Sequence, residues 1–209
     1  MKIVFDFAGV VFNWHPETML RRETPHLAHD DASTRFLKEQ VFQAWGGDWG
    51  EFDRGRVEAD ELVQRIARRT GFAATDVRRI VDAVPRELQP APDTVAWLAE
   101  LRAQRQAIYF LSNMPEPYAA HLERENDFLG WFDDGIFSSR VFHIKPEREI
   151  FELAAERFDA RPAETFFFDD HEPNVEMARS LGWQAVHFRT AAQARAEMHE
   201  LQARLGTRR

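Results

Sequence analysis

Residues 2–11 read Lys2-Ile3-Val4-Phe5-Asp6-Phe7-Ala8-Gly9-Val10-Val11. This short apolar run with β-branched residues predicts a buried strand. Asp6 stands where the run ends, and Ala8 and Gly9 let the backbone turn sharply after it. In an α/β protein, ligands bind in loops at the carboxyl ends of parallel strands. Asp6 could therefore attack a substrate or hold a metal ion, although an aspartate that only caps a turn explains these ten residues equally well.

The composition is that of a globular protein. The chain has 209 residues, 44% of them hydrophobic, which is enough for one sizeable core or for a core with a small inserted unit. Its net charge of −8 argues against binding a nucleic-acid phosphate backbone, because that activity needs a basic face. The chain has no cysteine, so disulfides, thiolate catalysis and cysteine-ligated zinc are excluded.

The sequence also indicates where the protein works. No charged and apolar leader precedes the first strand, and no apolar run approaches the ~20 residues of a membrane span. We therefore expect a cytoplasmic protein with neither a membrane nor a nucleic-acid partner. Its oligomeric state stays open between a monomer and a homodimer.

The first part of the chain after residue 14 is expected to be helical. Apolar residues recur at helical spacing in residues 18–23, 31–44, 57–71 and 75–84, which predicts four helices. Asp30 or Asp31 can cap the second of them. The run from Gly46 to Gly50 is expected to break the second helix, and Pro85 is expected to end the fourth.

After Pro85 the pattern changes to alternating strands and helices. Strands are expected at 107–111, 135–137, 165–168 and 185–188, with helices between and after them. Such an alternation predicts a parallel sheet covered by helices, and therefore an α/β fold. The domains are then a core of residues 1–14 and 86–209 and an inserted, all-helical domain of residues 15–85.

Four polar sites are expected at the same edge of this sheet, because each follows a strand or precedes a helix there. Four such sites predict a common pocket. They are Asp6, Ser112 with Asn113, Lys145, and Asp169 with Asp170.

The residue types at these sites fit phosphoryl transfer. The carboxylates of Asp6, Asp169 and Asp170 offer oxygen ligands that suit Mg²⁺, and a cation would offset their mutual repulsion. Ser112 and Lys145 would supply a hydroxyl donor and a positive charge to the oxygens of a phosphoryl group. Asp6 would then be the in-line nucleophile, forming an aspartyl-phosphate that water cleaves.

This set resembles the haloacid dehalogenase-like (HAD) hydrolase superfamily over the whole chain. The family's first motif is an apolar strand followed by Asp-x-Asp, and its second is a strand ending in Ser or Thr. The third is a Lys that Pro often follows, and the fourth is an acidic pair with an Asn shortly after. The matching stretches are Val4 to Val10, Leu111-Ser112-Asn113, Lys145-Pro146, and Phe168 to Asn174.

The resemblance implies a Rossmann-like core with an inserted C1-type cap, and it assigns roles to residues. Asp6 is the implied nucleophile and also a Mg²⁺ ligand. Ser112 and Lys145 would bind the phosphoryl group of a small phosphorylated substrate, Asn113 would contact that substrate, and Asn174 would brace the loop. The other implied Mg²⁺ ligands are the backbone carbonyl of Ala8, Asp169 and Asp170.

Ala8 departs from the family pattern. The usual phosphatase has a second Asp there, which protonates the leaving group and then activates water. Alanine does neither, although its backbone carbonyl still serves the metal site. The chain is similar to a sugar-phosphatase-like subgroup, including glucose-1-phosphate phosphatase, that has Gly at this position. We therefore expect a Mg²⁺-dependent phosphatase of a small metabolite such as a sugar phosphate.

Two other functions stay open. A 2-haloacid dehalogenase also lacks the second Asp, but that branch needs no metal, and the Asp169-Asp170 pair argues for one. A non-catalytic binding protein could have kept the fold and lost the acid/base residue. Four aromatic residues in or next to the helical insertion either line a pocket beneath it or pack its core: Trp14, Trp45, Trp49 and Phe52.

Overall fold

A computed structural model describes residues 1–206, apart from the side chains of residues 45, 205 and 206. Within these residues, five parallel strands form one sheet in the order β3-β2-β1-β4-β5. The first strand is therefore central, as a site built around its end requires. The predicted α/β fold with a parallel sheet is confirmed. The strands are β1 (Lys2–Phe5), β2 (Ala107–Ser112), β3 (Asp134–Phe137), β4 (Thr165–Asp169) and β5 (Gln184–His187).

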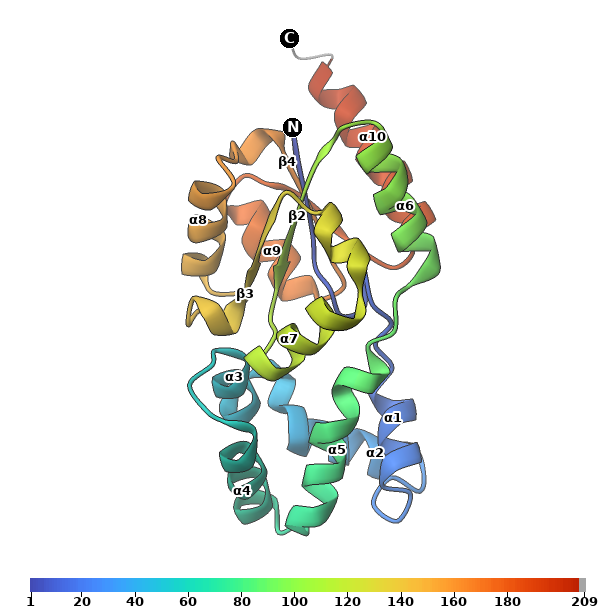
Figure 1. Ribbon diagram of the computed structural model, residues 1–209, viewed down its shortest axis with the longest axis vertical. Helices are drawn as coiled ribbons and strands as arrows, with labels where there is room; N and C mark the ends of the chain where they lie inside the picture. Colours follow the sequence, from blue (N-terminus) through green and yellow to red (C-terminus); the bar gives the residue numbers. More distant parts are fainter. Residues whose placement is uncertain (207–209) are drawn as a thin grey trace.

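The two faces of the sheet are covered by different helices (Figure 1). α6 (Pro92–Ala103) and α10 (Ala191–Gly206) lie on one face, and α8 (Arg148–Arg157) and α9 (Glu172–Ser180) on the other. Phe168 packs on Trp97 of α6, whereas its neighbour Phe167 packs on Phe151 of α8. Alternate residues of β4 thus feed opposite apolar layers, which is why this strand reads as a continuous hydrophobic run. α7 (Glu116–Glu125) follows β2.

The five α-helices that come before α6 lie together beyond the carboxyl end of the sheet (Figure 1). One apolar cluster runs from the sheet face into this block and includes Phe5, Phe42 and Ile80. The division into a core and a separate cap domain stays a prediction. The helices are α1 (Pro16–Glu23), α2 (Asp31–Phe42), α3 (Gly47–Asp53), α4 (Ala59–Thr70) and α5 (Ala74–Glu87).

Two sequence expectations for this block are wrong. The described block has five α-helices rather than four, because the glycine-rich run from Gly46, which follows the end of α2 as expected, also begins α3. The side-chain Oε1 of Gln43 accepts a hydrogen bond from the backbone N–H of Asp48 (2.9 Å) at the start of this helix. Trp49 and Phe52 are buried beneath it. Burial of these aromatic side chains offsets the low helix propensity of glycine.

The second wrong expectation concerns Pro85, which lies inside α5 instead of after it. Proline has no N–H, so the carbonyl of Val81, four residues earlier, loses its helical partner. The Tyr118 hydroxyl of α7 donates a hydrogen bond to that carbonyl (2.7 Å). A neighbouring helix therefore satisfies the group that the proline leaves unpaired.

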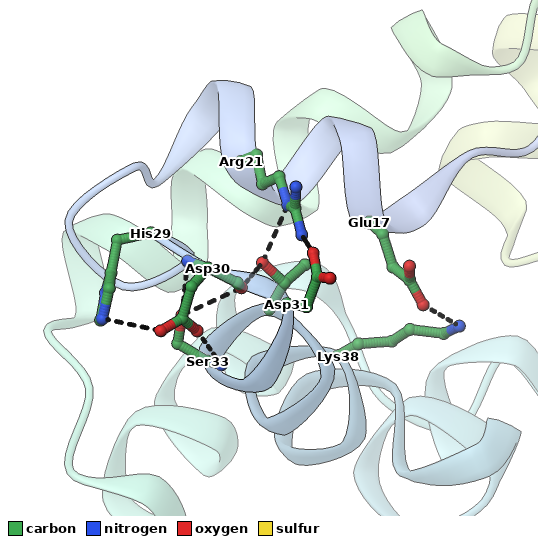
Figure 2. Close-up of polar contacts among 8 residues, drawn as sticks. Glu17, Arg21, His29, Asp30, Asp31, Ser33 and Lys38 are labelled. Carbon is green, nitrogen blue, oxygen red and sulfur yellow. Dashed lines mark hydrogen bonds and ion pairs between the residues drawn. The ribbon is translucent and has the colours of Figure 1, made fainter.

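The start of α2 shows which aspartate is the cap (Figure 2). The Asp30 carboxylate accepts a hydrogen bond from the backbone N–H of Ser33 (2.7 Å), and the Ser33 hydroxyl accepts one from the N–H of Asp30 (3.0 Å). This reciprocal pair is a capping box. Asp31 instead points to Arg21 of α1 and forms an ion pair with it. Among the described residues, no helix combines the length and apolar character that crossing a membrane requires.

Candidate active site

The strand ends bring three of the expected charged residues into direct contact. Lys145 Nζ lies 2.8 Å from Asp6 Oδ1 and 2.6 Å from Asp169 Oδ2. Asp6 follows β1 and Asp169 ends the neighbouring β4, whereas Lys145 comes from the loop before α8. Lys145 is only 2% exposed. Although burial opposes its charge, the Asp169 and Asp6 carboxylates raise the pKa of Lys145.

The turn after β1 is held by a backbone hydrogen bond to β4 and depends on a glycine. The N–H of Asp6 donates to the carbonyl of Phe168 (2.9 Å), which ties the end of β1 to β4. Gly9 has φ +80°, and a Cβ at this position would lie 2.3 Å from Asp170 Oδ2. Glycine is therefore needed twice here, for the backbone conformation and for the close approach of Asp170. The turn places a third carboxylate beside Asp6.

The three carboxylates form one acidic cluster. Oxygen atoms of Asp6, Asp169 and Asp170 all lie within 4.8 Å of one another. Burial raises the pKa of Asp6 to about 8; Lys145 opposes this rise, while Asp169 and Asp170 add to it. Loss of hydration, followed by the charge of Asp169, raises the pKa of Asp170 to about 6. One lysine does not neutralise three carboxylates, so this oxygen donor set fits a divalent cation such as Mg²⁺.

Two asparagines hold the charged residues in place. The amide of Asn113 donates to the backbone carbonyl of Lys145 (2.9 Å) and accepts from its N–H (2.7 Å). The amide nitrogen of Asn174 lies 3.0 Å from both carboxylate oxygens of Asp169. Asn174 thus has the bracing position that the resemblance implied. Asn113, for which a substrate contact was expected, has its amide atoms paired with the backbone of Lys145.

Ser112 lies at the end of β2, the strand next to β1, and its hydroxyl is unpaired. Its Oγ is buried with no hydrogen-bond partner among the residues that the structure describes. A buried polar atom without a partner costs about 1–3 kcal/mol, so a folded protein rarely keeps one without a reason. An acceptor oxygen of a bound substrate could take the hydrogen bond that this hydroxyl has free to donate.

A cavity of about 400 Å³ opens above the acidic cluster. Asp6, Ala8, Lys145 and Asp170 line its floor, and both the helical block and the loops after the strands contribute to its wall. The residues from the helical block are Ala44, Gly46, Trp49, Asp53, Arg54 and Val84. Of the four aromatic residues singled out, Trp14 and Trp49 line the cavity, whereas Phe52 is buried in the packing. The side chain of Trp45 lies outside the described residues. The apolar wall consists of Trp14, Trp49, Val84, Leu88, Met114, Tyr118 and Ile144.

The cavity also contains a carboxylate that the sequence analysis missed. Asp53, the last residue of α3, is 4% exposed and lines the cavity together with Asp6 and Ala8. Burial raises the pKa of Asp53 well above its usual value, and the charge of Asp6 adds to this rise. No motif marked this residue, because it belongs to the helix that the glycine-rich run concealed.

Comparison with known proteins gives a consistent result. A family model described as haloacid dehalogenase-like hydrolase matches residues 3–182. The chain is 27% identical over 199 residues to sesquiterpene phosphatase astK of Aspergillus oryzae, covering 95% of this chain and 94% of that one. It is 26% identical over 215 residues to D-ribitol-5-phosphate phosphatase of Bacteroides thetaiotaomicron, covering 94% and 95%.

A solved structure shares the fold. It is a HAD family enzyme from Bacteroides thetaiotaomicron in complex with magnesium and inorganic phosphate. The TM-score is 0.70 at 23% identity, and the match covers 90% of this chain and 93% of that chain.

Proposed function

This chain belongs to the haloacid dehalogenase-like hydrolase family, and from that premise we propose that it hydrolyses phosphate monoesters through a phosphoryl group carried on Asp6. The observation that carries the proposal is the contact of Lys145 with both Asp6 and Asp169 at the floor of a cavity. The buried, unpaired hydroxyl of Ser112 ends the neighbouring strand at the same sheet edge and supports it. A buried cation and a free hydroxyl next to a carboxylate suit a tetrahedral anion.

Each residue then has a part in two displacements. Lys145 and Ser112 hold the phosphoryl oxygens while an Asp6 carboxylate oxygen attacks phosphorus. The bond from phosphorus to the ester oxygen breaks as the bond to Asp6 forms, and the ester oxygen takes a proton and leaves as an alcohol. Water attacks the same phosphorus next, the bond to Asp6 breaks, and inorganic phosphate leaves.

The acidic cluster would hold Mg²⁺ during both steps. Asp6, Asp169 and Asp170 would supply carboxylate oxygens, and Ala8 would supply its backbone carbonyl. The ion, when bound, adds positive charge that offsets the negative charge of the phosphoryl group and of the cluster. Its presence would also favour the ionised form of Asp6 that the attack requires.

Two substrate classes are supported by different observations. Sugar phosphates, the class expected from the sequence, are supported by the similarity to a D-ribitol-5-phosphate phosphatase. Phosphate esters of apolar alcohols are favoured by the seven mostly buried apolar residues of the cavity wall, and by the similarity to a sesquiterpene phosphatase. An apolar wall discriminates against a hydroxyl-rich ring, because it leaves the ring hydroxyls without partners.

The other expected functions are less well supported. Attack of Asp6 on the carbon of a 2-haloacid needs no metal ion and so does not require the acidic cluster that includes Asp6. A binding protein has no need of a carboxylate in contact with a buried lysine, which is costly to keep. We further propose that residues 15–85 act as a cap that covers the cavity, on a core of residues 1–14 and 86–209. A cytoplasmic location and a monomer or homodimer stay predictions.

Phosphate release tests the proposal and separates the substrate classes. The purified chain is given sugar phosphates, phosphate esters of linear and cyclic apolar alcohols, and p-nitrophenyl phosphate, each with Mg²⁺ and with chelator. We expect Mg²⁺-dependent release, with the apolar-alcohol and sugar esters ranked by kcat/KM. If halide is released from 2-haloacids in chelator while no ester is cleaved, the proposed function is wrong.

A further inference from the structure

A phosphatase with alanine at position 8 lacks the usual proton donor for the leaving alcohol. The methyl group of Ala8 faces the cavity and has no titratable atom. General acid–base assistance is worth about 10²–10⁴-fold in rate, so an alkyl ester would be cleaved slowly unless another group supplies the proton.

Asp53 has the position and the chemistry of a proton donor. Its side chain is buried and lines the same cavity as Asp6 and Ala8. Within the described part of the chain, no hydrogen bond or ion pair to its carboxylate is formed. A buried carboxylate without a partner is costly, and protonation removes that cost. Asp53 is therefore expected to carry a proton while the enzyme waits for substrate.

The groups that face Asp53 act in both directions. Burial, followed by the charge of Asp6, favours the protonated form, whereas Arg54 and Lys145 favour the carboxylate. Burial, followed by the charge of Asp53, raises the pKa of the Tyr118 hydroxyl of α7. Asp6 and Asp53 are thus two carboxyl groups in one cavity with different environments, because Lys145 contacts Asp6 but not Asp53. Such a difference separates a nucleophile from an acid.

The backbone around Asp53 is fixed to the sheet although it belongs to the helical block. The Ser138 hydroxyl donates to the carbonyl of Asp53 (2.5 Å) and accepts from the N–H of Met114 (2.8 Å). Arg54 Nη1 lies 2.5 Å from Glu147 Oε1. Gly55 has φ +74°, and a Cβ there would lie 2.6 Å from the backbone oxygen of Ser139. These contacts hold Asp53 at a constant place relative to Asp6, as proton transfer requires.

We propose that Asp53 is the general acid and base that replaces the side chain missing at Ala8, an inference that rests on the proposed phosphatase function. The Asp53 carboxyl gives its proton to the ester oxygen as the bond from phosphorus to that oxygen breaks. The resulting Asp53 carboxylate takes a proton from the water that attacks the phosphoryl group on Asp6. Phosphate leaves, and both carboxyl groups return to their starting states.

The test compares two leaving groups in the Asp53→Asn variant. An alkyl phosphate needs a proton on its leaving oxygen, whereas p-nitrophenolate leaves readily as an anion. We expect kcat for the alkyl ester to fall by about 10²–10⁴-fold and kcat for phosphorylation by p-nitrophenyl phosphate, measured as the first burst of nitrophenolate, to stay nearly unchanged. Asp48→Asn is the matched control, because Asp48 lies on the same helix but pairs with Arg69.

A second pair of variants separates catalysis from structure. Ala8→Asp combined with Asp53→Asn should recover much of the alkyl-ester rate, because the acid returns at position 8. Asp53→Ser serves if the asparagine variant does not fold, and binding of orthovanadate shows that each variant keeps its phosphoryl site.

The outcomes distinguish the two proposals. Equal losses for both esters, or no loss for either, would overturn the role of Asp53 while leaving the phosphatase in place. Failure of the unsubstituted chain to cleave any ester with Mg²⁺ would overturn the proposed function, and the role of Asp53 with it.

Discussion

The two walls of the cavity differ in how they are built. The sheet edge presents charged groups held by short contacts, such as the 2.6 Å between Lys145 Nζ and Asp169 Oδ2. The facing wall presents apolar side chains with one carboxyl group, Asp53, among them; Trp49, Val84 and Asp53 come from the helical block, and Met114, Tyr118 and Ile144 from the core. From this difference we infer that the proposed phosphoryl chemistry belongs to the sheet edge, whereas the apolar wall, to which the insertion and the core both contribute, would select the substrate. Variants that alter one wall test whether activity or substrate selection depends on that wall alone.

The largest effect is expected at Asp6. Asp6→Asn removes the nucleophile, so turnover should fall by at least about 10³-fold for every ester, whatever its alcohol. The measurement is phosphate release at saturating substrate, with Asp127→Asn, an exposed position, as the control. If the variant lost activity on only some esters, Asp6 would act in substrate selection, and the division between the two walls would be wrong.

Lys145 is expected to matter for stability as well as for activity. Lys145→Met leaves Asp6 and Asp169 without their shared partner, which should lower the free energy of unfolding by about 3 kcal/mol in chelator. Urea unfolding measures this change. Mg²⁺ should restore part of the lost stability, because the ion offsets the same carboxylates. Equal losses with and without Mg²⁺ would contradict a shared site.

The acidic cluster also predicts how stability depends on pH. Because the pKa of Asp6 rises from 3.8 to about 8 on folding, the folded chain binds more protons than the unfolded chain between these values. The contribution of Asp6 to the free energy of unfolding should therefore be complete at and below about pH 4 and decrease as pH rises towards 8, by at most about 1.4 kcal/mol per pH unit.

Thermal unfolding of the metal-free chain across this range measures the slope. Mg²⁺ should flatten it, since the ion favours the carboxylates. A metal-free chain that grew more stable from pH 5 to pH 8 would show that the cluster is not held as described.

Gly9 and Gly71 form a matched pair with nearly equal φ angles, +80° and +78°. Alanine at either site should cost about 1 kcal/mol, because the left-handed backbone disfavours a Cβ. Only Gly9→Ala should also lower activity, since its Cβ would meet Asp170 Oδ2, whereas nothing lies within 4 Å at Gly71. Equal activity of the two variants would remove Asp170 from the proposed metal site.

The smallest effect is expected on the apolar wall. Val84→Thr keeps the shape of the side chain but adds a hydroxyl to the cavity. We expect kcat/KM for an apolar-alcohol phosphate to fall several-fold relative to a sugar phosphate, with little change for p-nitrophenyl phosphate. An equal decrease for all three esters would mean that Val84 acts on stability or on the chemistry rather than on selection.

The sequence predicts the sheet edge well for a physical reason. Asp6, Ser112 and Asp169 each end an apolar strand, and a parallel sheet brings those ends to one edge, so local patterns determine a three-dimensional site. Lys145 was expected at the same edge because it precedes a predicted helix, a weaker pattern than the end of an apolar strand.

The helical wall is predicted less well because its structure depends on distant contacts. α3 begins in glycines whose local preference opposes a helix, and it forms because Trp49 and Phe52 are buried. α5 passes through Pro85 because a tyrosine from another helix satisfies the Val81 carbonyl. Asp53 lies on α3, so the error in the helix concealed the residue.

Trapping the covalent intermediate tests the central claim most directly. The chain with Mg²⁺ is mixed with p-nitrophenyl phosphate, quenched in acid during turnover, digested and examined by mass spectrometry. We predict one phosphoryl group on the N-terminal peptide that contains Asp6, and reduction of that aspartyl-phosphate by borohydride should mark the same residue. Phosphate release during turnover with no phosphorylated Asp6, or with the phosphoryl group on another residue, would contradict the account.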